Sequence, residues 1–193
     1  MALYMTDNHQ EAFLRPAIRE IAPYLDPYLQ QVNIHIYPGE EGFSVKLEQG
    51  EAILLAAGRV EALRALCALA AAIQNGKASF YLEQQTPFDT RGVMYDCSRN
   101  SVPTVATVKL LLRRMALMGL NALMLYTEDT YEVVQTPALG HYRGRYSHAE
   151  MREIDDYANL LGIEVIPCIQ TVAHLERLLR WSCTADVRDD PTT

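Results

Sequence analysis

Hydrophobic and polar residues follow two different patterns along the chain, and the pattern changes near residue 88. In the first part, short segments alternate apolar with polar residues, which predicts β-strands at 32–37, 43–49, 52–56 and 78–83. Residues 59–75 are rich in alanine and leucine, the strongest helix formers, and predict a helix. We therefore expect an α+β domain over residues 1–88, with one helix covering a mostly antiparallel sheet.

The first thirty residues carry a weaker helical signal. Apolar side chains between residues 12 and 25 recur at helical spacing. Pro16, Pro23 and Pro27 interrupt them, and proline inside a helix removes a hydrogen bond and clashes with the preceding turn. Helix is therefore expected here only in patches.

From residue 89 onwards, strand and helix patterns alternate. Strands are predicted at 92–96, 121–126 and 163–169. Two helices are predicted to start after Thr104 and Ser147, both suitable N-caps, and a third to begin within 173–181. Such alternation predicts parallel βα units with right-handed crossovers. The spacing of roughly 30 to 40 residues suits a (β/α)8 barrel, which needs about 250 residues.

Three units cannot close such a barrel. We therefore predict an α/β fold in which the α+β domain precedes the first three βα units of a truncated TIM-type barrel, over residues 89–193. A smaller open α/β sheet is the alternative. In the truncated form the unclosed barrel edge is exposed, and a homo-oligomer formed through that edge is expected.

Charge and composition exclude several classes of partner and cofactor. The net charge of −7 argues against nucleic acid and anionic membranes. No apolar run is long enough to span a membrane, and the amino terminus does not resemble a secretory signal. The four cysteines form no C-x-x-C pair, which indicates reduced thiols in a cytoplasmic protein. Nucleotide-binding and metal-binding motifs are absent, so no cofactor and no metal are expected.

Polar residues follow each strand of the second part, where the carboxyl ends of parallel strands meet at one edge. They are Asp96, Ser98, Arg99 and Asn100, then residues 127–130, then Gln170, Thr171, His174 and Glu176. Alternating donors and acceptors suit a polyhydroxylated ligand. Loops are also polar because they face solvent, so the residues alone leave both interpretations open.

Three segments of the second part resemble glycoside hydrolase family 20, the β-N-acetylhexosaminidases. Residues 91–104, RGVMYDCSRNSVPT, resemble the R-G-x-x-x-D-x-S/A-R opening of the family's barrel. Residues 115–126 resemble its first helix and second strand, and residues 166–176 its third strand. The forms Tyr126-Thr-Glu-Asp129 and Gln170-Thr-x-x-His-Leu-Glu176 are closest to a divergent bacterial branch. The first 85 residues resemble the α+β domain that commonly precedes this barrel.

The resemblance implies substrate-assisted, retaining hydrolysis of terminal N-acetylhexosamine in glycans. The catalytic Asp-Glu pair of the family follows the fourth barrel strand, which we expect to lie beyond this chain. Arg91 matches the arginine that binds sugar hydroxyls, although a salt bridge between domains is an alternative role for it. His174 and Asp129 match the supporting imidazole–carboxylate pair near the general acid, and Glu128 competes with Asp129 for that role. Glu128 and Glu176 are further candidates for substrate contact.

The sequence thus predicts a portion of an exo-β-N-acetylhexosaminidase that is inactive on its own. A non-catalytic sugar-binding or assembly module built on a half-barrel is the second hypothesis. An unrelated small α/β enzyme with its site at the same strand ends is the third.

Overall fold

The computed structural model describes residues 2–5 and 8–189, and its contacts divide them into two compact units. The first unit comprises residues 1–91 together with 111–121 and 159–163. The second comprises 92–110, 122–158 and 164–193. The division at residue 91 lies close to the predicted boundary at 88. However, the second half of one helix of the second part, residues 111–118, and the last turn of another, residues 159–161, group with the first unit.

A five-stranded sheet forms the first unit, in the order β1-β2-β4-β3-β5. The strands are β1 (Ala2–Met5), β2 (Asn33–Pro38), β3 (Phe43–Glu48), β4 (Glu51–Ala56) and β5 (Phe80–Gln84). β2 runs parallel to both β1 and β4, whereas β3 is antiparallel to β4 and β5. The sheet is therefore mixed rather than mostly antiparallel, because β1 was not anticipated and helix α1 returns the chain in the same direction.

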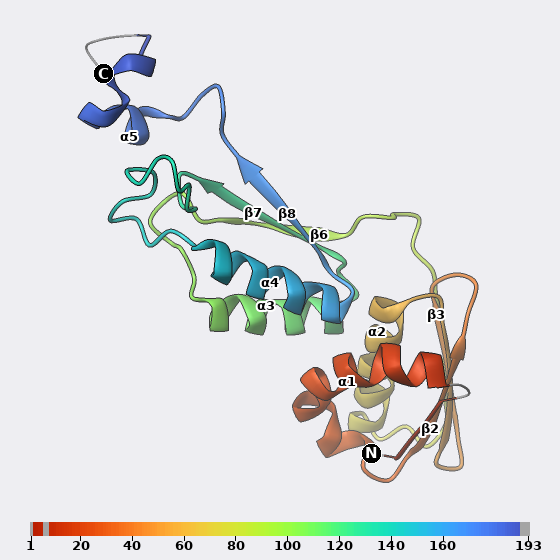
Figure 1. The fold of residues 1–193 in the computed structure, drawn as a ribbon. Helices are drawn as coiled ribbons and strands as arrows, with labels where there is room; N and C mark the ends of the chain where they lie inside the picture. The colour runs from red at the N-terminus through yellow and green to blue at the C-terminus, as the bar shows by residue number, and fades with distance from the viewer. Residues whose placement is uncertain (1, 6–7, 190–193) are drawn as a thin grey trace. The chain divides into compact units, whose positions relative to one another are not determined.

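Two helices, α1 (Asn8–Leu29) and α2 (Arg59–Gln74), cover this sheet (Figure 1). α1 is one helix of 22 residues and contains all three prolines, so the prediction of patches was wrong. The reason is its apolar stripe, in which Ile18, Ile21 and Leu25 are almost completely buried against the sheet and α2. With Leu14 and Leu29 also buried, five such side chains at about 1.5–3 kcal/mol each offset a cost of about 3 kcal/mol for each proline.

A separate parallel sheet, β6-β7-β8, forms the centre of the second part of the chain. Its strands are β6 (Gly92–Asp96), β7 (Ala122–Glu128) and β8 (Glu164–Ile169), and the linking helices are α3 (Val105–Met118) and α4 (His148–Leu161). After β8 come only the short α5 (Glu176–Leu179) and the 3-10 helix η1 (Ser182–Val187). The predicted third helix, beginning within 173–181, is thus reduced to a single turn.

Both N-caps predicted from the sequence are formed. The Thr107 amide donates to the Thr104 hydroxyl at 3.3 Å and begins α3. At the start of α4, the Ser147 amide donates to the Glu150 carboxylate at 2.8 Å, and the Glu150 amide donates to the Ser147 hydroxyl at 3.2 Å. These reciprocal bonds satisfy amides that a helix start otherwise leaves unpaired.

The two faces of the β6–β8 sheet differ. α3 and α4 lie along the same face of the sheet (Figure 1). Leu123 and Leu125, which share one face of β7 because side chains alternate along a strand, are fully buried. The register places Met94, Met124 and Ile166 together on the opposite face, where Met94 is 59% exposed. No described helix covers that face. Among the described residues, no helix is long and apolar enough to cross a membrane.

Candidate functional site at the carboxyl ends of β6, β7 and β8

The three strands end side by side, so the residues after them share one edge of the sheet. Asp96, the last residue of β6, pairs in register with Tyr126 of β7, which pairs with Cys168 of β8. The predicted convergence of polar groups therefore occurs at this edge, which is the position that α/β proteins use for binding and catalysis.

Asp96 and Arg99 form the first part of the site. The Asp96 carboxylate accepts hydrogen bonds from the Ser98 hydroxyl at 2.6 Å and the Ser98 amide at 2.8 Å. Arg99 donates to the other carboxylate oxygen at 3.2 Å. The Ser98 bonds, and secondarily the Arg99 charge, hold the pKa of Asp96 below its usual range. Asp96 is therefore ionised at neutral pH, and the Arg99 side chain, 62% exposed, keeps donors free for a ligand.

Glu128 forms the second part. The register of β7 against β8 shifts between Tyr126 and Glu128, and Glu128 pairs with Ile169 at the end of the strand. Its side chain is only 11% exposed. Its carboxylate accepts from the Tyr126 hydroxyl at 3.2 Å and from Arg99 at 3.4 Å. Gln170, after β8, donates to the Tyr126 hydroxyl at 2.8 Å. Hydrogen bonds thus connect groups that follow all three strands.

Strained backbone is concentrated at the same edge. Asn100 after β6 and Glu128 at the end of β7 have φ values of 63° and 50°, and His174, in the segment after β8, has a φ of 59°. Positive φ is unfavourable for residues with a side chain and costs about 1–3 kcal/mol unless the surroundings enforce it. Such strain is typical of functional sites, and it supports the assignment of this edge.

Asp129 is buried just behind Glu128. Its side chain is 8% exposed, and it accepts a hydrogen bond at 2.9 Å from Arg143, whose side chain is 6% exposed. Arg143 also donates to the Asn100 side chain and to the Ser98 carbonyl, so it joins the loops that follow β6 and β7.

His174 and Glu176 lie in the exposed segment after β8. Among the described residues, neither contacts Asp129, which is paired with Arg143 instead. The predicted Asp129–His174 pair is therefore not formed in this structure, because the loop carrying His174 leaves the sheet edge before it can reach Asp129. Glu128 is the predicted residue that the structure brings into the polar cluster together with Asp96 and Arg99.

Arg91 does not lie at this edge. It precedes β6, and its guanidinium is paired with Glu61 at 2.8 Å and donates to the carbonyls of Gly119 and Phe88 at 3.0 and 2.8 Å. This position does not fit the predicted contact with sugar hydroxyls, and its donors are used within the first unit. Arg91 lines a cleft of about 690 Å³ in that unit, which includes none of the strand-end residues.

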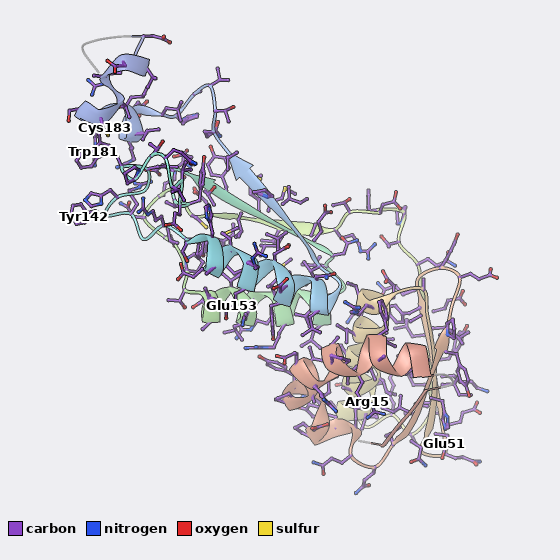
Figure 2. All side chains as sticks on the ribbon, in the orientation of Figure 1. Arg15, Glu51, Tyr142, Glu153, Trp181 and Cys183 are labelled. Atoms are coloured by element: carbon purple, nitrogen blue, oxygen red, sulfur yellow. The ribbon has the colours of Figure 1, made fainter. Side chains whose placement is uncertain are left out.

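Aromatic rings gather on two loops beyond the same edge. The His141 ring lies 4.0 Å from that of Tyr142 and 5.7 Å, edge-on, from that of Trp181. Figure 2 shows Tyr142 and Trp181 near each other, with Tyr142 at the periphery. Trp181 therefore packs against His141, and the Tyr142 ring is exposed to solvent.

Sequence reasoning did not single out Arg99, Tyr126, Gln170 or Arg143 as site residues. Arg99 and Gln170 were among the polar residues after the first and third strands, and for Arg99 its spacing from Asp96 was the available signal. Arg143 belongs to the Tyr-Arg-Gly-Arg-Tyr segment at 142–146, and nothing in the sequence distinguishes its role from that of Arg145. Within 2–5 and 8–189, no three His, Cys, Asp or Glu residues are placed to hold a metal ion.

Comparison with known proteins gives a consistent result. Human hexosaminidase D is 31% identical over 104 residues, which cover 54% of this chain and 21% of that protein. Arabidopsis thaliana beta-hexosaminidase 1 is 27% identical over 128 residues, covering 61% and 24%. The chain thus spans between a fifth and a quarter of these relatives.

The structure of a β-N-acetylhexosaminidase from Bacteroides fragilis superposes with a TM-score of 0.70 at 19% identity, over 93% of this chain and 42% of that one. This likeness shows a shared mixed α/β fold. Residues 88–188 match the catalytic domain of glycosyl hydrolase family 20, and the chain therefore belongs to that family.

Proposed function

We propose that the chain is a portion of an exo-β-N-acetylhexosaminidase, which removes terminal N-acetylhexosamine from glycans by retaining, substrate-assisted hydrolysis. The observation that carries this proposal is the polar edge of β6–β8 within the segment that matches the family's catalytic domain. Relatives named as hexosaminidases support the reaction class.

The chemistry of the edge suits a sugar. Each pyranose hydroxyl both donates and accepts, and Arg99 offers donors beside the acceptors Asp96 and Glu128. A guanidinium fork can engage two adjacent hydroxyls at once. We therefore assign to Arg99 the sugar-binding role that the resemblance gave to Arg91, with Glu128 as the neighbouring acceptor. His174 and Asp129 keep their predicted supporting roles as hypotheses.

The finer architecture is also proposed. Parallel strands whose linking helices all lie on one face are typical of a barrel wall, whereas doubly wound sheets carry helices on both faces. Met94, Met124 and Ile166 would then face the barrel interior, where further strands would cover them. We propose that β6–β8 are the first three strands of that barrel, and that the catalytic Asp-Glu pair comes from a strand outside residues 1–193.

Three narrower predictions rest on sequence. The unusual Tyr126–Asp129 and Gln170–Glu176 segments favour a divergent branch of the family, and the human and plant relatives give no support for a specifically bacterial one. A cytoplasmic location agrees with four unpaired cysteines. The alternative of a sugar-binding or assembly module, oligomeric through the open edge, has no observation that favours it over the enzyme.

Hydrolysis of an aryl N-acetyl-β-glucosaminide tests the proposal. The enzyme at its full natural length should release the aryl group, and the isolated 193-residue chain should not, because general acid–base catalysis contributes about 10²–10⁴ in rate. Turnover by the isolated chain that is abolished by Glu128→Gln would show that the acid–base group lies within it. Absence of turnover by the full-length protein on N-acetylglucosaminides and N-acetylgalactosaminides would refute the enzyme and favour the binding module.

A further inference from the structure

Arg143 is a buried cation that bonds both to the loop after β6 and to the start of its own loop, directly after β7. It belongs to the connection between β7 and α4, and its side chain is 6% exposed. One terminal nitrogen donates to the Asn100 carboxamide at 2.9 Å, and the other donates to Asp129 at 2.9 Å and to the Ser98 carbonyl. The loops after β6 and β7 are thus joined through one guanidinium.

Burying a guanidinium is unfavourable unless its charge and donors are satisfied. Here the charge is matched by Asp129, and both terminal nitrogens are used, while the buried Nε has no acceptor among the described residues. A solvated loop has no need of such an arrangement. Arg145, two residues away, shows the simpler case, because it donates to the Pro137 and Leu139 carbonyls of its own loop.

The residues that Arg143 holds flank the exposed groups of the site. Ser98 and Asn100 stand on either side of Arg99, and Asp129 directly follows Glu128. Asn100 and Glu128 both have positive φ, a conformation that relaxes unless neighbouring contacts maintain it. Arg143 supplies those contacts through Ser98 and Asn100 beside Arg99 and through Asp129 beside Glu128, and the Arg99 and Glu128 side chains lie 3.4 Å apart.

We propose that Arg143 is a positioning residue that fixes Arg99 and Glu128 relative to each other for sugar binding, without touching the sugar itself. This inference rests on the proposed function. Removing Arg143 leaves the binding groups present but frees the loops that carry them. Affinity should therefore fall in the ground state and the transition state alike, which raises KM more than it lowers kcat.

Three variants of the full-length enzyme test this, namely Arg143→Met, Arg143→Lys and the matched control Arg145→Met. We expect Arg143→Met to raise KM for the aryl glycoside about tenfold, with kcat changed less than threefold. Arg143→Lys should recover part of the melting temperature but not KM, because one ammonium cannot reach three acceptors on two loops. Arg145→Met should lower the melting temperature and leave KM unchanged.

Amide hydrogen exchange on the 193-residue chain gives a readout that does not depend on activity. Arg143→Lys should increase exchange at 98–100 and 128–130, whereas Arg145→Met should increase it only within its own loop. Equal KM values for the two methionine variants, or exchange confined to 131–147 in Arg143→Lys, would overturn the positioning role. An inactive wild-type enzyme with the expected exchange pattern would refute the proposed function and leave the loop coupling established.

Discussion

The charged residues of the two units are used in opposite ways. In the first unit, Arg91 and Glu61 form an ion pair whose remaining arginine donors go to backbone carbonyls. At the carboxyl ends of β6–β8, Arg99 is shared between Asp96 and Glu128 at 3.2 and 3.4 Å and remains largely exposed. The donors of Arg91 are thus used by protein groups, whereas the Arg99 guanidinium remains accessible to a ligand.

Backbone geometry shows the same contrast. The described residues of the first sheet contain one positive-φ residue other than glycine, Gln49, in the β3–β4 hairpin turn. Asn100, Tyr142 and His174 belong to the loops after β6, β7 and β8, and Glu128 is the last residue of β7. The positive φ in the hairpin is part of the tight turn that reverses the chain. Positive φ values in several separate loops are not required by one turn, so contacts from elsewhere in the fold must maintain them. Exposed charged side chains and positive-φ residues from separate loops occur together at the carboxyl ends of β6–β8, which distinguishes a candidate site from a merely polar region.

The largest effect on kcat/KM should come from substituting the exposed Arg99, compared with the same substitution of the paired Arg91. In the full-length enzyme, Arg99→Ala should lower kcat/KM about 10- to 100-fold, because a charged hydrogen bond to a hydroxyl contributes roughly 1.5–3 kcal/mol. Arg91→Ala should change kcat/KM less than twofold and lower the melting temperature. Steady-state kinetics and thermal unfolding of both variants decide this. The reverse ranking would return Arg91 to the sugar site and remove Arg99 from it.

A glycine in each unit provides a matched pair with a smaller effect. A Cβ on Gly42 would lie 2.2 Å from the Gln84 carbonyl oxygen, and one on Gly140 would lie 2.5 Å from that of Asp129. Both residues have positive φ, so alanine at either position should destabilise folding by about 1–3 kcal/mol. Denaturant unfolding should show similar losses.

Only Gly140→Ala should also raise KM, because the clash displaces Asp129 and with it the Arg143 contacts. Gly42→Ala, measured well below its melting temperature, serves as the control for destabilisation itself. A similar rise in KM for both variants would mean that the enzyme responds to lost stability, and that the two regions do not differ in the way described.

Local signals explain how much could be predicted from the sequence. Alternation and helix propensity located α2 and the seven strands other than β1, and Thr104 and Ser147 marked two helix starts because capping depends on neighbours in the chain. α1 was underestimated because its stability comes from burial of Ile21 and Leu25, which the prolines do not prevent. Glu128 could be proposed because it stands at the carboxyl end of a predicted strand. The Arg143–Asp129 pair could not, because it joins residues 14 apart in a loop that has no periodic pattern. A motif does not say at which end of a strand each of its arginines acts, so the position of Arg91 before β6, paired with Glu61, could not be foreseen from the sequence.

The smallest effect concerns Asp96 and acid. Hydrogen bonds from Ser98 lower the pKa of Asp96 in the folded chain, so the ionised carboxylate stabilises the fold above the pKa of the unfolded chain. That contribution is lost as the pH falls through the lower, folded pKa. Asp96→Asn should therefore reduce the melting temperature slightly at pH 7. The difference from wild type should begin to shrink near pH 4, about the pKa of an unfolded aspartate, and vanish once the pH is below the folded pKa.

Glu51 in the first unit is the control for this effect. Hydrogen bonding from Asn33, and from His35 to a lesser extent, lowers its pKa in the same direction. Glu51→Gln should also lose its small stability difference in acid, because the sign of the pKa shift sets the direction of the pH dependence. Only Asp96→Asn should also lower kcat/KM at neutral pH, since only Asp96 shares its charge with the exposed Arg99. Equal kinetics in both variants would show that Asp96 shapes its turn and takes no part in holding Arg99 for a ligand.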